Sequence, residues 1–199
     1  MAEPTSRSFP TASPPTPTAR TSAVMARLTC RAVSTAQERA THFRIRHQVF
    51  VVEQGLFGDA SAGDASAGDA GAGDAGGSGA GQDRDAHDDD PATVHVVGLA
   101  DGVICGTVRL YPLAGTPGRW KGDRLAVLDG HRHQGLGAPL VRFAVATAGR
   151  RGGQEMEAYV QPANVRFFEW LGWRPAGGLV TYAGIPHQRM LIGLTQQDR

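Results

Sequence analysis

A glycine-containing loop carries the clearest chemical signal in the sequence. The run Leu125-Ala-Val-Leu-Asp-Gly-His-Arg-His-Gln-Gly135-Leu-Gly-Ala138 joins a short apolar segment to a helical apolar pattern. Glycines let the backbone approach a ligand closely, and a helix N-terminus presents free N–H groups and about half a positive charge. These properties predict a pyrophosphate cradle. A Walker loop would need Gly-Lys-Ser/Thr, and a dinucleotide fingerprint would need a third glycine near Leu140, so neither fits.

The elements that must position this loop follow from hydrophobic periodicity. Strands are expected at 28–33, 94–100, 103–111, 125–128, 155–160, 178–182 and 189–194, and helices at about 35–50, 136–148 and 163–171. Ser34 or Thr35 is expected to cap the first helix. Asp101 and Gly102 supply the positive φ angles of a tight hairpin. An early antiparallel pair followed by alternating strands and helices predicts a mixed α/β fold rather than a pure Rossmann fold.

Two low-complexity segments lie outside this pattern. Residues 1–26 are rich in Pro, Thr and Ser, whereas residues 58–91 are rich in Gly, Ala and Asp and contain a five-residue repeat without a regular apolar position. Neither can bury enough apolar surface to offset the entropy of ordering it, so we expect a disordered tail and a disordered insert. The insert would interrupt a single domain spanning 27–199. Met1 and Met25 are both candidate translation starts.

Composition and charge narrow the class of protein. The net charge is +1, but the insert is strongly acidic and the remainder is therefore basic, which suits a phosphorylated small molecule as well as nucleic acid. Aromatic residues do not cluster with arginines as base stacking requires. There is no bilayer-spanning run, no secretory signal and no zinc-ligand spacing around Cys30 and Cys105. We expect a cytoplasmic protein with no metal, no membrane and no nucleic-acid partner; nineteen arginines to one lysine indicate a high-GC bacterium.

Several segments, in order along the chain, resemble the Gcn5-related N-acetyltransferases (GNATs). Residues 132–138 are similar to their coenzyme A motif, Arg/Gln-x-x-Gly-x-Gly/Ala, and residues 161–173 to their Asn-x-x-Ala-x-x-Phe-Tyr-x-x-x-Gly-Phe segment. Residues 43–54 resemble the Leu-Arg-x-x-Val-Phe-x-x-Glu-Gln opening of one branch, which also has an acidic cluster, here 88–90, and an ending similar to 184–190. Within that branch the chain most resembles an acyltransferase domain encoded beside a nitrilase in bacterial nitrogen-assimilation gene clusters.

The resemblance implies a GNAT fold, with a mixed, mostly antiparallel sheet flanked by helices, and an N-acetyltransferase activity. Such an enzyme transfers an acetyl or other acyl group from acyl-CoA to a primary amine of a small molecule. Acetyl-CoA would place its pantetheine arm beside the apolar strand, as an added strand does, and its pyrophosphate on the loop amides. The residues expected to bind it are Leu125, Ala126, Val127, Arg132, His133, Gln134, Gly135, Leu136, Gly137, Ala138, Asn164 and Phe168.

Catalysis requires an acceptor for the proton of the amine. An alkylamine with a pKa near about 10.4 is protonated at neutral pH, so a base or a water chain must act before attack. Glu53, His187 and His95 are candidates, although Glu53 could instead pair with an arginine, His187 could be a turn residue and His95 could lie on a solvent face. A backbone N–H near Val127 would polarise the thioester carbonyl.

The main departure from the family pattern is Phe168. A tyrosine that protonates the leaving thiolate commonly stands at this position, and phenylalanine has no proton to give. Tyr159 or Tyr182 could replace it. Three residues are expected to contact the substrate. The two arginines among them could hold a carboxylate by bidentate pairing, or they could be structural. These residues are Arg46, His95 and Arg109.

Two other functions stay open at this level. An acyl-homoserine-lactone-synthase-like enzyme shares part of the early pattern, and a non-catalytic acyl-CoA-binding or regulatory module is favoured by Phe168. Binding without turnover would distinguish the module. The sequence also leaves open a homodimer, and it does not identify the acceptor amine or the acyl length, because fold analogy does not determine substrate.

Overall fold

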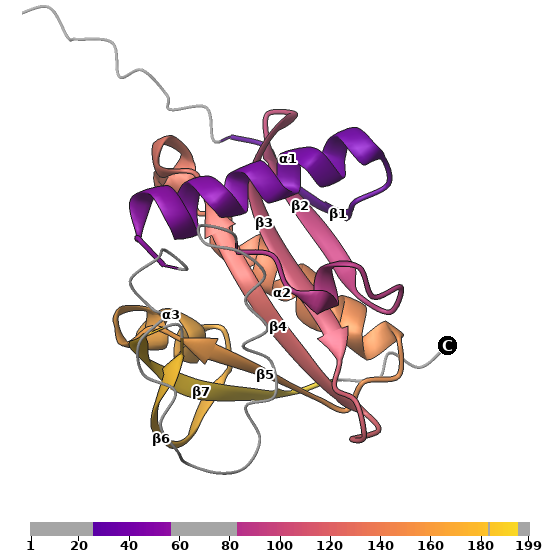
Figure 1. Ribbon diagram of the computed structural model, residues 1–199, viewed down its shortest axis with the longest axis vertical. Helices are drawn as coiled ribbons and strands as arrows, with labels where there is room; N and C mark the ends of the chain where they lie inside the picture. Colours follow the sequence, from indigo (N-terminus) through magenta and orange to yellow (C-terminus); the bar gives the residue numbers. More distant parts are fainter. Residues whose placement is uncertain (1–25, 57–82, 183, 195–199) are drawn as a thin grey trace, which may run out of the picture.

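A seven-stranded sheet forms the centre of the molecule. The structure, a computed structural model, describes residues 26–56, 83–182 and 184–194. Its strands follow the order β1-β2-β3-β4-β5-β7-β6, and helices cover both faces of the sheet (Figure 1). All neighbouring strands are antiparallel except β4 and β5. The expected mixed, mostly antiparallel α/β fold is confirmed.

The strands and helices largely follow the predicted map. The strands are β1 (Leu28–Ala32), β2 (Val94–Ala100), β3 (Val103–Pro112), β4 (Arg119–Val127), β5 (Glu155–Val160), β6 (Arg174–Tyr182) and β7 (Ile185–Gly193). The helices are α1 (Ala36–Arg46), its π-helical continuation η1 (His47–Glu53), α2 (Gly137–Arg150) and α3 (Val165–Trp170), with 3₁₀ turns η3 (Ala86–Asp88), η4 (Asp129–Gln134) and η5 (Pro162–Asn164). Within the described residues, no helix is long and apolar enough to cross a bilayer.

Local sequence signals explain two of the element boundaries. Thr35 caps α1 by accepting the backbone N–H of Glu38 at 3.1 Å, while the Glu38 carboxylate accepts the backbone N–H of Ser34 at 2.8 Å. Asp101 and Gly102 join β2 to β3 with φ angles of 48° and 84°. Both the helix cap and the tight hairpin predicted from the sequence are therefore confirmed.

Helix α2 packs closely on one face of the sheet, which we call the α2 face. Leu136 and Leu140 are completely buried there, and they lie over Gly98 of β2 and Gly106 of β3. A Cβ atom at Gly106 would lie 2.9 Å from the side chains of both leucines. Because any larger residue would push the helix away, these two glycines set the distance between α2 and the sheet and hence the position of the loop that precedes the helix.

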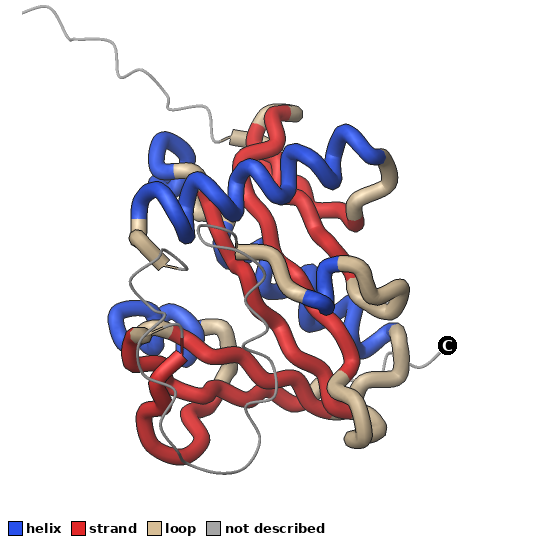
Figure 2. The backbone as a smooth tube through the Cα atoms, viewed as in Figure 1, coloured by secondary structure: helices blue, strands red, loops and turns tan. Residues whose placement is uncertain are grey.

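The opposite face, which we call the α1 face, carries α1, η1 and η3 (Figure 2). The expected end of the disordered insert at residue 91 is corrected here, because residues 83–91 are described and form part of the fold. Asp83 and Asp88 are buried at 3% and 2% exposure by pairing with arginines of the sheet and of α1. Because this segment is rich in Asp, like the rest of the insert, its pairing with distant arginines could not be predicted from its composition. The rest of the insert, 58–82, lies outside the described residues, as do residues 1–25 of the tail.

Strands β4 and β5 diverge and form a fork (Figure 1). They pair only at Arg119, Trp120 and Lys121, so the later residues of β4 have no strand on that side. On its other side β4 has a bulge against β3, where Arg124 adopts a φ of 54°. Strand β4 starts at Arg119 rather than at Leu125 as expected, because its first half alternates polar and apolar residues instead of forming an apolar run.

The spacing between α2 and the sheet can be tested with Gly106→Val. We expect this variant to lose about 1–3 kcal/mol of unfolding free energy, because the branched side chain would overpack the two buried leucines. The measurement is urea unfolding followed by circular dichroism. Gly193→Val is the control, since a Cβ there meets no atom within 4 Å. Equal stability of the two variants would contradict close packing at Gly106.

Candidate functional site

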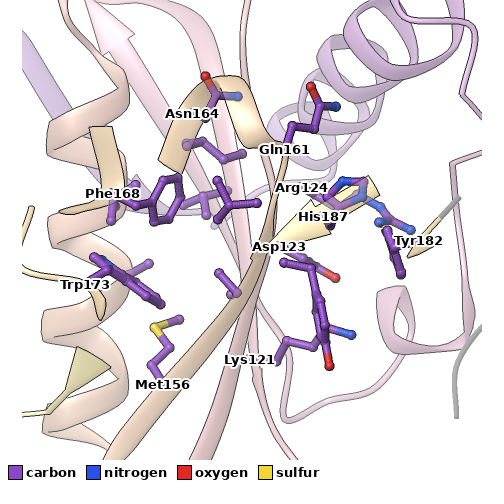
Figure 3. Close-up of a pocket in the computed structure, with 18 of the residues that line it drawn as sticks. Lys121, Asp123, Arg124, Met156, Gln161, Asn164, Phe168, Trp173, Tyr182 and His187 are labelled. Carbon is purple, nitrogen blue, oxygen red and sulfur yellow. Dashed lines mark hydrogen bonds between the residues drawn. The ribbon is translucent and has the colours of Figure 1, made fainter. Parts of the chain in front are cut away.

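A cavity lies in the fork between β4 and β5. Its volume is about 140 Å³, and residues of β4, β5, α2 and the end of the sheet line it (Figure 3). Because the fork opens through the sheet, the cavity reaches both the α1 face and the α2 face. The lining residues are Phe50, Gln54, Leu56, Val108, Lys121, Gly122, Asp123, Arg124, Leu125, Val141, Ala144, Met156, Ala158, Tyr159, Val160, Gln161, Asn164, Phe168, Trp173, Tyr182 and His187.

The half of the cavity on the α2 face is apolar. Phe168 and Trp173 meet edge to face with ring centroids 5.3 Å apart, and Met156 lies below them (Figure 3). All three are at most 7% exposed, and Ala144 of α2 completes this wall. This half can hold an aliphatic group out of contact with water.

The half on the α1 face is polar and aromatic. Tyr159 and Tyr182 lie nearly parallel, with an interplanar angle of 11° and centroids 6.1 Å apart. Arg124 donates to the Tyr182 hydroxyl at 2.9 Å, and the Lys121 ammonium lies 5.2 Å and 5.6 Å from the centroids of the two tyrosine rings. His187 meets Tyr182 edge to face at 5.4 Å.

His187 is held in an orientation suited to accepting a proton. Its Nδ1 lies 3.0 Å from the backbone carbonyl of Ile185, and a carbonyl can only accept a hydrogen bond. The neutral ring must therefore carry its proton on Nδ1 and leave Nε2 as an acceptor. The residue lines the cavity and is only 6% exposed.

The open edge of β4 offers backbone groups to the fork. The N–H of Leu128 donates to the Cys105 carbonyl on β3 at 2.9 Å, so the preceding residue, Val127, directs its own N–H and carbonyl to the opposite side. The Val127 carbonyl accepts from Arg132 Nε at 3.0 Å. The Val127 N–H therefore faces the fork, where the sequence analysis expects a donor to a thioester carbonyl.

The predicted phosphate loop is a 3₁₀ turn that leads into α2. Gly135 closes this turn with a φ of 78°, and no side chain caps the N-terminus of α2. A Cβ at Gly130 or Gly135 would meet no atom within 4 Å, so the loop is open to a ligand. Leu136 and Ala138 are buried and can contribute only backbone groups. The loop, Arg132 to Ala138, does not line the cavity itself, and it lies beyond the far end of β4.

A buried ionic network fills the α1 face beside the polar half of the cavity. Arg46 of α1 pairs with Asp83 and Asp88, both at 2.5 Å, and Arg109 of β3 pairs with Asp85 at 2.5 Å. We call the following residues the Arg–Asp network: Arg46, Arg109, Arg124, Asp83, Asp85, Asp88 and Asp123.

The network extends to the cavity through β4. Arg124 pairs with Asp85 at 2.9 Å, and Asp123 accepts two hydrogen bonds from Arg109 at 2.8 Å and 2.6 Å. Burial by itself would raise the pKa of Asp123, but the Arg109 charge and hydrogen bonds outweigh burial and hold that pKa well below its usual range. Asp88 behaves in the same way: burial opposes ionisation, and Arg46 and Arg109 lower its pKa.

Two of the predicted substrate residues are occupied by this network. Arg46 and Arg109 are at most 1% exposed, and their guanidinium groups bond to protein carboxylates. The placement corrects their expected role, because neither lines the cavity and neither can turn to a substrate carboxylate without leaving a buried acid unpaired. It agrees with the structural alternative.

Two of the candidate bases also lie away from the cavity. Glu53 pairs with Arg132, which was the alternative considered for it, and this ion pair joins η1 to the phosphate loop. His95 lies beneath α1, where its Nε2 donates to the Asp88 carbonyl at 3.1 Å. Of the expected catalytic side chains, the cavity brings together Tyr159 and His187.

Three further residues line the cavity without having been predicted from the sequence: Lys121, Asp123 and Arg124. They precede the apolar run that marked the strand, and their charged character concealed that they belong to it. A signal was available for Lys121, since it is the only lysine in the chain. No group of three or more His, Cys, Asp or Glu side chains suited to a metal ion occurs in the part of the chain that the structure describes.

Comparison with known proteins gives one family and many structures of the same fold. Residues 74–173 match the model of the acetyltransferase (GNAT) family. A Lactobacillus plantarum protein described as an N-acetyltransferase is 22% identical, with 84% of this chain and 99% of that chain covered and a TM-score of 0.64. FeeM, an N-acyl amino acid synthase from uncultured soil microbes, is 14% identical over 86% of this chain and 93% of its own, with a TM-score of 0.62. BjaI, a CoA-dependent acyl-homoserine lactone synthase, is 17% identical over 86% and 84%, with a TM-score of 0.61. At these identities the structures show a shared fold.

Two histidines beside the network, the buried His42 and the half-buried His95, should make stability depend on pH. His42 is completely buried with its ring centroid 4.9 Å from that of His95. Burial, aided by the Arg46 and His95 charges, lowers the pKa of His42 to about 3, and burial also lowers the pKa of His95. An unfolded histidine has a pKa near about 6.5, so below that pH the unfolded chain binds more protons than the folded one. The free energy of unfolding is therefore unaffected by the titration of His42 above about pH 6.5, and it decreases as the pH falls from there toward 3.

We expect His42→Phe to flatten the pH dependence of the unfolding free energy between about pH 6 and about pH 4.5, which lies between the pKa of an unfolded histidine and that of His42 in the folded protein. One proton changes the slope by about 1.4 kcal/mol per pH unit. The measurement is the free energy of unfolding in urea at several pH values. Phe43→Leu is the control, because it disturbs the same cluster without removing a titratable group and should keep the wild-type slope. An unchanged slope in His42→Phe would show that His42 is not held neutral.

Proposed function

Because this chain belongs to the acetyltransferase (GNAT) family, we propose that it is an N-acyltransferase that moves an acetyl or other acyl group from acyl-CoA to a primary amine of a small molecule. One observation carries the proposal. The fork between β4 and β5 leads from an uncapped helix N-terminus to a cavity with an apolar half and a polar half. These are the parts that a thioester donor and an amine acceptor need in one place.

The donor would lie along the open edge of β4. Backbone amides at the start of α2 would hold its pyrophosphate, and the unpaired groups of β4 would bond its pantetheine arm as an added strand does. The geometry suits this, since Gly137 begins the helix without a side-chain cap and the Val127 N–H faces the fork. That N–H would polarise the thioester carbonyl, and an oxyanion donor of this kind contributes about 2.7–4 kcal/mol.

Among the three candidate bases, His187 fits best. Its Nε2 is an acceptor, and the ring lies in the polar half of the cavity, opposite the apolar half that would hold the acyl group. Nε2 would take the proton from the amine, directly or through one water, as the nitrogen attacks the carbonyl carbon. Glu53 would instead support the phosphate loop through Arg132.

A tyrosine would supply the proton that Phe168 cannot. The Tyr182 hydroxyl accepts a hydrogen bond from Arg124, so its own proton is left to donate. Tyr159 stacks beside it and also lines the cavity. Either hydroxyl would protonate the coenzyme A thiolate, while Phe168 would pack against the donor.

The finer assignments rest on the sequence. We place the enzyme with the acyltransferases encoded beside a nitrilase in nitrogen-assimilation gene clusters, in a bacterial cytoplasm, on the motif resemblance alone. The disordered tail and insert, and a homodimer, stay predictions. A second candidate, an acyl-homoserine-lactone-synthase-like activity, is kept because BjaI shares the fold. Release of free coenzyme A with a simple amine, and not only with S-adenosylmethionine, would separate the two.

The donor site can be tested with Gly137→Glu. A carboxylate at the start of α2 would repel the pyrophosphate, so we expect the affinity for acetyl-CoA to fall by at least about tenfold in isothermal titration. A side chain is tolerated there, because a Cβ would come no closer than 3.5 Å to Phe167. Gly178→Glu is the control, as it adds the same charge to an open position on β6, outside the phosphate loop and the cavity. Equal loss in both variants, or in neither, would contradict the assigned cradle.

The role of His187 gives a separate prediction. His187→Gln should lower kcat by about 10²- to 10⁴-fold, because a positioned general base contributes that much. Acetyl-CoA affinity should stay at the wild-type value. A variant with normal kcat would exclude His187 as the base. Tight donor binding with no turnover of any amine by the wild type would favour the non-catalytic module instead.

A further inference from the structure

The single lysine of the chain lies at the base of the fork. Lys121 is the last residue of β4 that pairs with β5, and it lines the polar half of the cavity (Figure 3). Its ammonium group lies 5.2 Å from the ring centroid of Tyr159 and 5.6 Å from that of Tyr182. Two nearly parallel rings thus contact one cation, which fixes its position by cation–π attraction.

The acids near Lys121 are committed to other partners. Glu157 stands opposite it in register, but its carboxylate accepts from Arg189 at 2.6 Å and from Arg119 at 3.3 Å. Asp123, two residues along β4, is bound by Arg109 at 2.6 Å and 2.8 Å. Among residues 26–56, 83–182 and 184–194, no carboxylate lies within ion-pair distance of the Lys121 ammonium. Within the described residues, the polar half of the cavity therefore contains an ammonium that forms no ion pair, although its charge helps to lower the pKa of Asp123, and such a group attracts an anion.

This anion is not the pyrophosphate of the donor. Lys121 and Val127 are six residues apart on β4, which corresponds to roughly 20 Å of strand before the phosphate loop begins. The loop and Lys121 therefore stand at opposite ends of the fork. A group that reaches Lys121 enters the acceptor half of the site, on the same side as His187.

We propose that the acceptor carries a carboxylate, bound by Lys121, in addition to the amine that is acylated. This proposal rests on the proposed N-acyltransferase function. Both Lys121 and His187 lie next to the Tyr182 ring, so a substrate beside this ring can place its carboxylate at the ammonium and its amine toward Nε2 of the base. Lys121 takes the role that the sequence analysis gave to Arg46 and Arg109, whose guanidinium groups are bonded within the protein.

Matched acceptors test the proposal directly. Amino acids of increasing chain length, from glycine to 6-aminohexanoate, are compared with the corresponding amines that lack the carboxylate, and release of free coenzyme A from acetyl-CoA is measured. We expect the best carboxylated acceptor to exceed the corresponding amine without a carboxylate in kcat/KM. Lys121→Met should raise KM for that acceptor by about 10- to 100-fold with a smaller effect on kcat, and Lys121→Arg should recover part of the loss.

Two controls keep the result specific. The loss of kcat/KM in Lys121→Met should be much smaller for the amines that lack the carboxylate than for the amino acids. Arg174→Met removes one exposed cation from β6, outside the cavity, and should leave KM unchanged. Equal kcat/KM for the two members of each acceptor pair, or discrimination that survives in Lys121→Met, would overturn the proposal. If instead Lys121→Met affects turnover only when succinyl-CoA replaces acetyl-CoA, the carboxylate belongs to the donor and the proposal is wrong.

A binding measurement separates this proposal from the proposed function. Biosynthetic ¹³C labelling at Cε gives a single lysine signal, because the chain has one lysine. Titration with the amino acids should shift that signal, and titration with the amines that lack the carboxylate should not. A shift without turnover of any amine would support the carboxylate site while contradicting the acyltransferase. Turnover of amines without a shift would support the acyltransferase while excluding the carboxylate site.

Discussion

The buried pairing of arginines with aspartates is the interaction on which the α1 face depends. It joins α1, β3 and the bulge of β4 to the segment 83–88, which has few apolar residues to anchor it. Removing one partner from a buried ion pair leaves an uncompensated charge and typically costs about 3–5 kcal/mol. The same network fixes Arg124, and Arg124 fixes the Tyr182 hydroxyl. The shape of the polar half of the cavity thus depends on carboxylates at the end of a low-complexity insert.

The fork divides the site by chemistry as well as by space. On the α2 face, Phe168, Trp173 and Met156 present apolar surface, whereas the α1 face presents one ammonium, one imidazole and two phenols. Under the proposed function, the acyl group and the amine would therefore approach from surfaces of opposite character. Separation of this kind lets each reactant lie in a favourable environment until the two are brought together at the gap between the strands.

The sequence predicted the parts of the fold that follow local rules. The Thr35 cap, the Asp101-Gly102 hairpin and the loop before α2 depend on residues close together in the chain. The acceptor half depends instead on which partners long-range folding supplies. Arg109 could have faced a substrate, and only the structure shows that Asp85 and Asp123 already bind it. The first half of β4 was also missed, because its alternate positions are charged and the apolar run begins only at Leu125.

The bulge at Arg124 changes which residues of β4 face α1, because it interrupts the alternation of side chains along the strand. Before it, the odd-numbered Lys121 and Asp123 face α1; after it, the even-numbered Ala126 packs against Ile45 and Val49 of the helix on that face. One extra residue thus decides which side chains the two ends of a single strand present to each face. A strand without the bulge could not direct Lys121 and Ala126 to the same face of the sheet. The bulge therefore lets one strand line the cavity at one end and pack against α1 at the other.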